Sequence, residues 1–224
     1  MENFFLRLSI MLVPVLMAIT CHEVSHGFIA DKFGDNTARF MGRLTLNPLK
    51  HLDILGTLMF FVFGIGWAKP VPVNFNNLKH PKRDMIWVAA AGPITNLILA
   101  TISAMVLRVI ASLSLDAIPS YQMFLEPILL MLAFFVYINF LLAIFNMIPI
   151  PPLDGGRVAV GLLPDRQAAA FSRIEPYGIL IIIVLVFYTG IFSHVILPIM
   201  NVGIQLLAGP YSNLVFNVTQ LLVR

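Results

Sequence analysis

The chain has 224 residues, of which 59% are hydrophobic and 11% are charged, and its formal net charge at pH 7 is +3. Soluble domains are about 45–50% apolar and about 25% charged, so the composition excludes an ordinary soluble protein and indicates an integral membrane protein. No basic block or aromatic-rich basic patch indicates a nucleic-acid partner. We expect a single membrane-embedded domain over residues 1–224, because no polar stretch approaches about 50 residues, the usual minimum for a folded domain.

The first apolar stretch, residues 4–29, is long enough to span a membrane as a helix. Near its end it carries the motif His22-Glu23-x-x-His26. Residues four apart share a face of a helix, so the two histidines can hold one metal ion, and Glu23 is placed to take a proton from water. Such side chains are costly beside lipid and are usually functional there. The preceding Cys21 faces another direction and is interpreted as a packing residue.

Residues 54–68 form a second apolar segment, but at about 15 residues it is short for a membrane crossing. Its glycines weaken a long helix, and both of its flanks are basic, which places both in the cytoplasm by the positive-inside tendency. The segment is therefore predicted to be a short re-entrant helix. The neighbouring residues 43–46 and 69–74 are predicted to be short strands near the cytoplasmic side, and the prolines of the second confine it to an edge.

Further spans are predicted at residues 85–107, at 125–147 and, with mild interruptions, at 177–197. The tail, residues 198–224, is uncertain: it is expected either to lie in the membrane interface or to form one more short span. Basic residues follow the first span, precede the second and follow the third, which places these three regions in the cytoplasm. The end of the first span that carries the motif therefore faces the same side as the region after the third span.

A catalytic zinc ion usually has three protein ligands and one open position. The strongest candidate for the third ligand is Asp154, because a proline-rich turn opens the chain after the third span and the two glycines that follow Asp154 permit tight turns. A carboxylate on such a loop, on the cytoplasmic side, can meet the first helix. The alternative third ligands are Asp31 and Asp35, which resemble solvated loop residues, and Asp53, which lies at a helix start.

Two further motifs lie downstream, namely Gly92-x-x-x-Asn96 in the second span and Asn146-x-x-Pro149 followed by the Leu-Asp-Gly sequence at residues 153–155. Together with the histidine motif they resemble the site-2 protease family of intramembrane metalloproteases. The resemblance covers roughly residues 15–157, and three motifs in the same order make it specific. No inserted PDZ or CBS domain is recognisable, so the chain resembles a compact form of that family.

The resemblance implies one zinc ion per chain, with His22, His26 and Asp154 as ligands and Glu23 as general base. It also implies that Asn96 and Asn146 line the site, where they hold the substrate backbone or the oxyanion.

These observations predict an all-α, polytopic helical bundle that acts as a zinc endopeptidase on membrane-spanning proteins, by attack of activated water on a peptide bond in or near the bilayer. The predicted location is a membrane, crossed several times (the plasma membrane in a prokaryote), with the site toward the cytoplasm. The expected partners are a transmembrane substrate and lipid, and the oligomeric state is left open. The alternative is a metal or solute transporter that uses the His/Asp cluster, but no internal repeat is present and a transporter has no need of Glu23.

Overall fold

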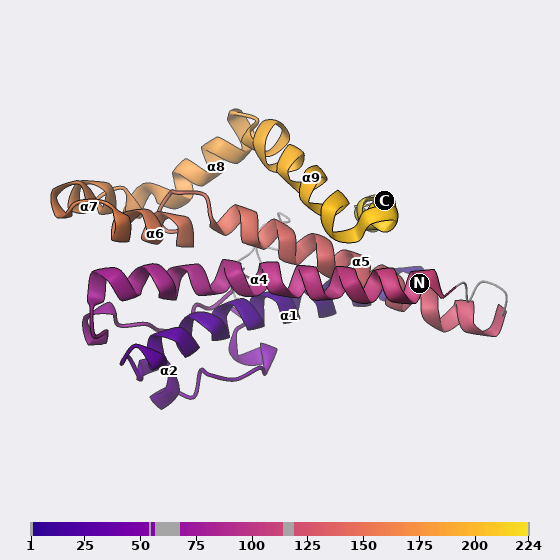
Figure 1. Cartoon of the computed structure of the whole chain (residues 1–224), viewed down its shortest axis with the longest axis horizontal. Coiled ribbons are helices and arrows are strands. Elements are labelled where there is room, and N and C mark those ends of the chain that lie inside the picture. The colour runs from indigo at the N-terminus through magenta and orange to yellow at the C-terminus, as the bar shows by residue number, and fades with distance from the viewer. Residues whose placement is uncertain (1, 54, 57–67, 114–118, 224) are drawn as a thin grey trace. The chain divides into compact units, whose positions relative to one another are not determined.

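The computed structural model describes residues 2–53, 55–56, 68–113 and 119–223. The described residues are mostly helical (Figure 1). Among them pairing is limited to an isolated bridge and no element is a β-strand, which confirms the predicted all-α class. In chain order the α-helices are α1 (Glu2–Lys32), α2 (Thr37–Phe40), α4 (Pro81–Ser112), α5 (Pro119–Asn146), α6 (Asp154–Leu162), α7 (Asp165–Ser172), α8 (Gly178–Tyr188), α9 (Leu197–Ala208) and α10 (Ser212–Val223). Short 3-10 helices lie at Pro48–Lys50, Phe75–Asn77, Glu175–Tyr177 and Gly209–Tyr211.

Five described stretches are long and apolar enough to cross a membrane. They are Leu8–Lys32, Pro81–Ser112, Leu125–Asn146, Asp165–Tyr188 and Phe192–Gln220. The first three agree with the predicted spans, whereas the predicted span at residues 177–197 is wrong in its bounds. Helix α8 ends before Gly190, whose φ of +65° is a conformation that other residues rarely adopt, and the tail belongs to the fifth stretch. The predicted re-entrant helix at residues 54–68 lies almost wholly outside the described residues.

The chain divides into two compact units. The first comprises Met1–Ala18, Asn96–Ile144 and Gly190–Arg224, and the second comprises Ile19–Thr95 and Phe145–Thr189. The histidine motif, Asp154 and Asn146 all belong to the second unit, whereas Asn96 belongs to the first.

In the first unit, helices pack through small and amide side chains. Ala100 and Ala104 are buried on one face of α4, and large apolar side chains cover its exposed face, as lipid contact requires. The fully buried Asn96 donates hydrogen bonds from Nδ2 to the backbone oxygen of Ala18 (3.2 Å) and to Oδ1 of Asn139 (2.8 Å). It therefore joins α4 to α1 and to α5, in the manner of polar residues that link membrane helices.

In the second unit, one buried carboxylate fixes the loop after α1 to the segment before α4. Asp35 is 0% exposed and accepts hydrogen bonds from the backbone N of Thr37 (3.2 Å), from Thr37 Oγ1, from Asn74 N (2.7 Å) and from Asn77 Nδ2 (3.0 Å). A small apolar core lies in the same unit and consists of Ala30, Leu78 and Val88 packed with Ile29, Phe33, Val73 and Phe75. The Asp35 network thus positions residues 73–77.

Substitution of Asp35 by Asn is expected to lower the free energy of unfolding by about 3 kcal/mol, since hydrogen bonds to a charged acceptor are lost in a buried site. Burial acts to raise the pKa of Asp35, but the donated hydrogen bonds outweigh burial and hold that pKa below its ordinary value. The stabilisation is therefore present at neutral pH and is lost as the pH falls below about 4. Denaturation in detergent micelles at several pH values measures the loss of stability and its dependence on pH. Substitution of the exposed Asp165 by Asn is the control.

The two predicted strands, residues 43–46 and 69–74, are not confirmed. In the part of the chain that the structure describes, pairing near them is limited to one isolated antiparallel bridge, between Leu52 and Ala68. The physical reason is that two prolines in the second segment lack the N–H that a ladder needs. In place of a neighbouring strand, the Arg43 guanidinium donates hydrogen bonds to two carbonyl oxygens of that segment, at 2.9 and 3.3 Å.

Candidate metal centre

The two histidines of the motif lie one helical turn apart on α1. Their ring centroids are 4.7 Å apart and the ring planes meet at 83°. Gly92 of α4 lies directly against both rings: a Cβ atom at this position would be 2.5 Å from Nε2 of His22 and 2.5 Å from Nε2 of His26. Helix α4 can approach the pair this closely because residue 92 has no side chain.

Asp154 reaches the same place from the start of α6. The chain between α5 and α6 is a tight, proline-rich turn. Gly155 and Gly156 pack against the backbone of this turn, where a Cβ atom would collide with the carbonyl of Met147 and with the nitrogen of Pro151, respectively. The two glycines therefore allow α6 to fold back against the end of α5, and this places the Asp154 carboxylate opposite the histidines.

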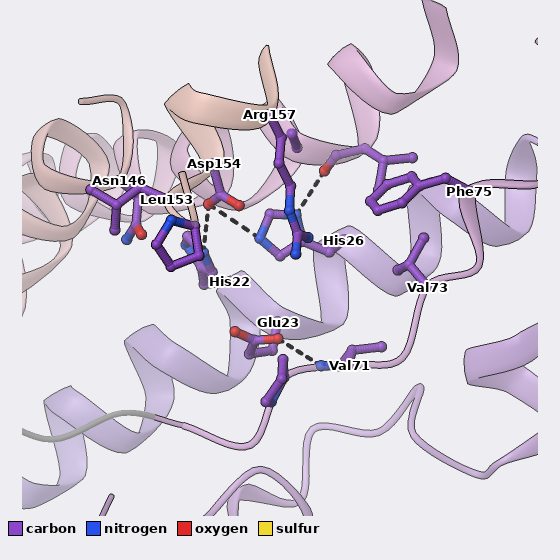
Figure 2. A pocket seen from close by; sticks show the side chains of 14 residues that line it. His22, Glu23, His26, Val71, Val73, Phe75, Asn146, Leu153, Asp154 and Arg157 are labelled. Atoms are coloured by element: carbon purple, nitrogen blue, oxygen red, sulfur yellow. Dashed lines mark hydrogen bonds and ion pairs between the residues drawn. The ribbon is translucent and has the colours of Figure 1, made fainter. Parts of the chain in front are cut away.

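The three side chains have the spacing of a zinc site. Oδ2 of Asp154 lies 3.1 Å from Nε2 of His22 and 3.4 Å from Nε2 of His26 (Figure 2). Ligand atoms at about 2.0–2.1 Å from a tetrahedral zinc ion are about 3.3 Å from one another. The Asp154 oxygen is also buried and has no hydrogen bond of good geometry to the described residues. A metal ion would supply the missing partner, so the group fits zinc.

The protonation states suit a metal as well. Nδ1 of His26 lies 2.7 Å from the backbone oxygen of Val88. A carbonyl oxygen can only accept, so Nδ1 carries the proton and Nε2 keeps its lone pair for a metal. Burial acts to raise the pKa of Asp154, but the two facing imidazoles outweigh burial and hold that pKa well below its ordinary value. The carboxyl group is therefore ionised, as a metal ligand must be.

Glu23 faces the same cavity and is fixed to the non-helical segment that follows residue 68. Its Oε2 accepts a hydrogen bond of 2.8 Å from the backbone N–H of Val71. The residues on either side, Pro70 and Pro72, have no N–H, so Val71 supplies the donor of this stretch. The second carboxylate oxygen forms no hydrogen bond with the described chain, which leaves it available to a ligand.

These groups surround a cavity of about 160 Å³. Its polar lining residues are His22, Glu23, His26, Asn146, Asp154 and Arg157, and its remaining described lining residues are apolar. Asn146 thus lies in the wall of the cavity. Asn96 belongs to the other unit, where it joins helices, so its predicted place at the site stays a prediction.

The three alternative carboxylates are held elsewhere. Asp31 pairs with Arg39 and accepts a hydrogen bond from Asn36, Asp35 has the network given above, and Asp53 accepts a hydrogen bond from the backbone N–H of Gly56. Among the described residues, the grouping with metal-ligand spacing is His22, His26 and Asp154.

Two residues of the site were not predicted. Gly92 was recognised only as part of a motif, whereas the structure places it against both imidazoles. From the sequence, Arg157 is only one of the basic residues that follow the third span, whereas in the structure it lines the cavity. Its position three residues after Asp154 at a helix start is a signal that the sequence contained, because residues three apart share a helix face.

Substitution of Gly92 by Ala is expected to push the two imidazoles apart and to weaken zinc binding about 10- to 100-fold, the range seen when groups that orient ligands are changed. Zinc affinity of the purified variant measures the effect. Gly203→Ala is a matched control: its Cβ would collide with Phe140 in the first unit, so it is expected to lower stability and to leave zinc affinity unchanged. An equal loss of zinc in both variants would contradict the assignment.

Comparisons with known proteins agree with this geometry. The family model for peptidase family M50 matches residues 10–124 and 117–189. The protein YwhC of Bacillus subtilis, named as a zinc metalloprotease, is 38% identical over 207 residues, which are 91% of this chain and 93% of YwhC. Rip2 of Mycolicibacterium smegmatis, also named as a zinc metalloprotease, is 32% identical over 76% of this chain and 63% of its own length.

A third relative with the same kind of name, MJ0611 of Methanocaldococcus jannaschii, is 30% identical over 70% of this chain and 72% of its own length. No solved structure matches the chain. The family match includes the histidine motif, Glu23 and Asp154, which are the residues that the fold brings together around one cavity. The resemblance to site-2 proteases is thereby confirmed, and the chain belongs to peptidase family M50 as a zinc metalloprotease of the membrane.

Proposed function

We propose that this metalloprotease is an intramembrane endopeptidase that cleaves membrane-spanning proteins within or near the bilayer, as in regulated intramembrane proteolysis. The observation that carries the proposal is the position of the histidine motif on α1, inside the candidate span Leu8–Lys32. Ionisable side chains inside a span are costly and are retained where they serve chemistry. A site built there suits a substrate that is itself in the membrane.

The residues of the cavity have different roles in the proposed reaction. Zinc, when bound, polarises the scissile carbonyl and lowers the pKa of water toward about 7. Glu23 takes the proton from the attacking water and delivers it to the leaving amine. The hydrogen bond from Val71 holds Glu23 in the cavity, and the Val88 carbonyl holds His26 in the tautomer that presents Nε2.

A transmembrane helix hides its amides in internal hydrogen bonds, so the substrate must open locally before water can attack. We assign the receiving edge to residues 71–74, which lie outside any helix and of which Val71 and Val73 line the cavity. The backbone oxygen of Val71 and the backbone N–H of Val73 form no hydrogen bond with the described chain. They are available to pair with an opened peptide, as edge strands do.

We further propose that the site faces the cytoplasm. In a prokaryote the membrane that holds the protein would be the plasma membrane. The support is the placement of basic residues in the regions that follow α1, precede α4 and follow α6. A cysteine introduced at Arg166 is expected to react with an impermeant reagent from the cytoplasmic side, and labelling from the other side would contradict this orientation.

The test of the proposed function uses the purified protein in liposomes with a substrate that has one apolar span. Product masses locate the cut, and the proposal expects one new pair of termini within or at the edge of that span. The Glu23→Gln variant provides the inactive control. Cleavage confined to a distant soluble domain, or equal cleavage by the variant, would overturn the proposal.

A further inference from the structure

Arg157 is the one lysine or arginine among the described residues that line the cavity. It stands in the first turn of α6, three residues after Asp154, so the two side chains share a helix face. Figure 2 shows its side chain extending from α6 toward the cavity, in which His26 also lies. A positive charge is unfavourable at a helix N-terminus, so the position is not explained by helix stability.

The Arg157 guanidinium is oriented by an aromatic ring. Its Cζ atom lies 5.4 Å from the ring centroid of Phe75, within the range of a cation–π contact. Phe75 is in turn positioned by its neighbours Asn74 and Asn77, which both donate hydrogen bonds to the buried Asp35. Contact with a ring face leaves the N–H edges of a guanidinium open to other partners.

Those N–H donors are not used within the described chain. The Arg157 side chain forms no hydrogen bond and no ion pair there, although two carboxylates line the same cavity. Asp154 faces the imidazoles and Glu23 accepts from Val71. A half-buried guanidinium with five unused donors, directed into a catalytic cavity, has the chemistry of a group that receives negative charge from a ligand.

We propose that Arg157 is a catalytic residue that donates a hydrogen bond to the scissile carbonyl oxygen as that oxygen becomes the oxyanion. The inference rests on the proposed hydrolysis of a peptide bond in this cavity. When water adds to the carbonyl carbon, the π electron pair moves onto the oxygen and the water proton goes to Glu23. When the C–N bond breaks, the carbonyl re-forms and the amine leaves with that proton. Arg157 stabilises the negative oxygen between these two events.

Full-length Arg157→Gln and Arg157→Lys, loaded with zinc, test the proposal. For Arg157→Gln we expect kcat to fall about 10²- to 10³-fold, the usual effect of removing an oxyanion donor, with KM changed less than about twofold. Arg157→Lys is expected to restore part of kcat, because it keeps the charge but not the planar donors. The matched control is Arg166→Gln. Arg166 is an exposed arginine of α7 and does not line the cavity, so this substitution is expected to leave kcat unchanged.

A binding measurement separates this proposal from the proposed function. A phosphinic peptide, whose tetrahedral anion mimics the oxyanion, is expected to bind Arg157→Gln more weakly by the same factor as kcat falls, while zinc content stays at the wild-type level. Unchanged affinity for the phosphinic peptide, a rise in KM at constant kcat, or loss of zinc would each overturn the role. If the wild type cleaves no membrane substrate, the proposed function fails, and the affinity for the phosphinic peptide still decides the role of Arg157.

Discussion

Replacement of Glu23 by Gln is expected to lower kcat for peptide cleavage about 10²- to 10⁴-fold, the contribution typical of a general base, while the zinc content stays at one ion per chain. An amide cannot take the proton of the attacking water. The substitution is otherwise conservative, because the Gln oxygen can still accept the hydrogen bond from the Val71 backbone N–H. Single-turnover cleavage in liposomes, together with metal analysis of the same sample, measures both quantities.

The metal analysis makes the Glu23 result specific. If Glu23→Gln lost zinc together with activity, Glu23 would belong to the ligand set rather than act as a base. If kcat were unchanged, another group would have to accept the proton, and the proposed chemistry would be wrong.

Replacement of Asp154 by Ala is expected to weaken zinc binding by more than about 100-fold, beyond the effect of changing a group that only orients a ligand. The carboxylate lies 3.1 and 3.4 Å from the two histidine nitrogens and is the third member of the group. Activity is lost with the metal and is expected to return in part when zinc is supplied in excess. Equilibrium competition with a chelator of known affinity measures the change.

Asp53→Asn is the matched control for the Asp154 substitution, since Asp53 was an alternative ligand and bonds instead to the backbone N–H of Gly56. It is expected to bind zinc with wild-type affinity. Wild-type affinity in Asp154→Ala, or a comparable loss in Asp53→Asn, would show that the third ligand has been misassigned.

The sequence predicted those features of the site that follow from local rules. The 3.6-residue period of a helix brings His22 and His26 to one face, and the proline-rich turn with the glycines after Asp154 indicates a carboxylate presented at the end of a helix. The spans were found from apolar length. The break between the last two spans, near Gly190, was not predicted, because it depends on a positive φ at this residue and apolar length contains no information on φ.

Other features depend on contacts between distant segments, and the sequence alone did not predict them. The approach of Gly92 to both imidazoles needs the packing of α4 on α1, and the tautomer of His26 depends on the Val88 carbonyl. The segment after residue 68 was predicted as a strand from its alternating pattern, but its two prolines lack N–H groups, and the N–H of Val71 between them binds Glu23. Arg157 was missed because its spacing of three residues from Asp154 becomes informative only once a helix is known to begin at Asp154.

X-ray absorption at the zinc edge of the purified protein tests the central claim, that two histidines of α1 and the aspartate of α6 hold the metal. The predicted spectrum shows nitrogen and oxygen neighbours at about 2.0–2.1 Å, the multiple scattering of two imidazoles and no sulfur, and it changes in Asp154→Ala supplied with excess zinc. A sulfur neighbour at about 2.3 Å, which would place Cys21 at the metal, or a spectrum that is unchanged in Asp154→Ala, would contradict it.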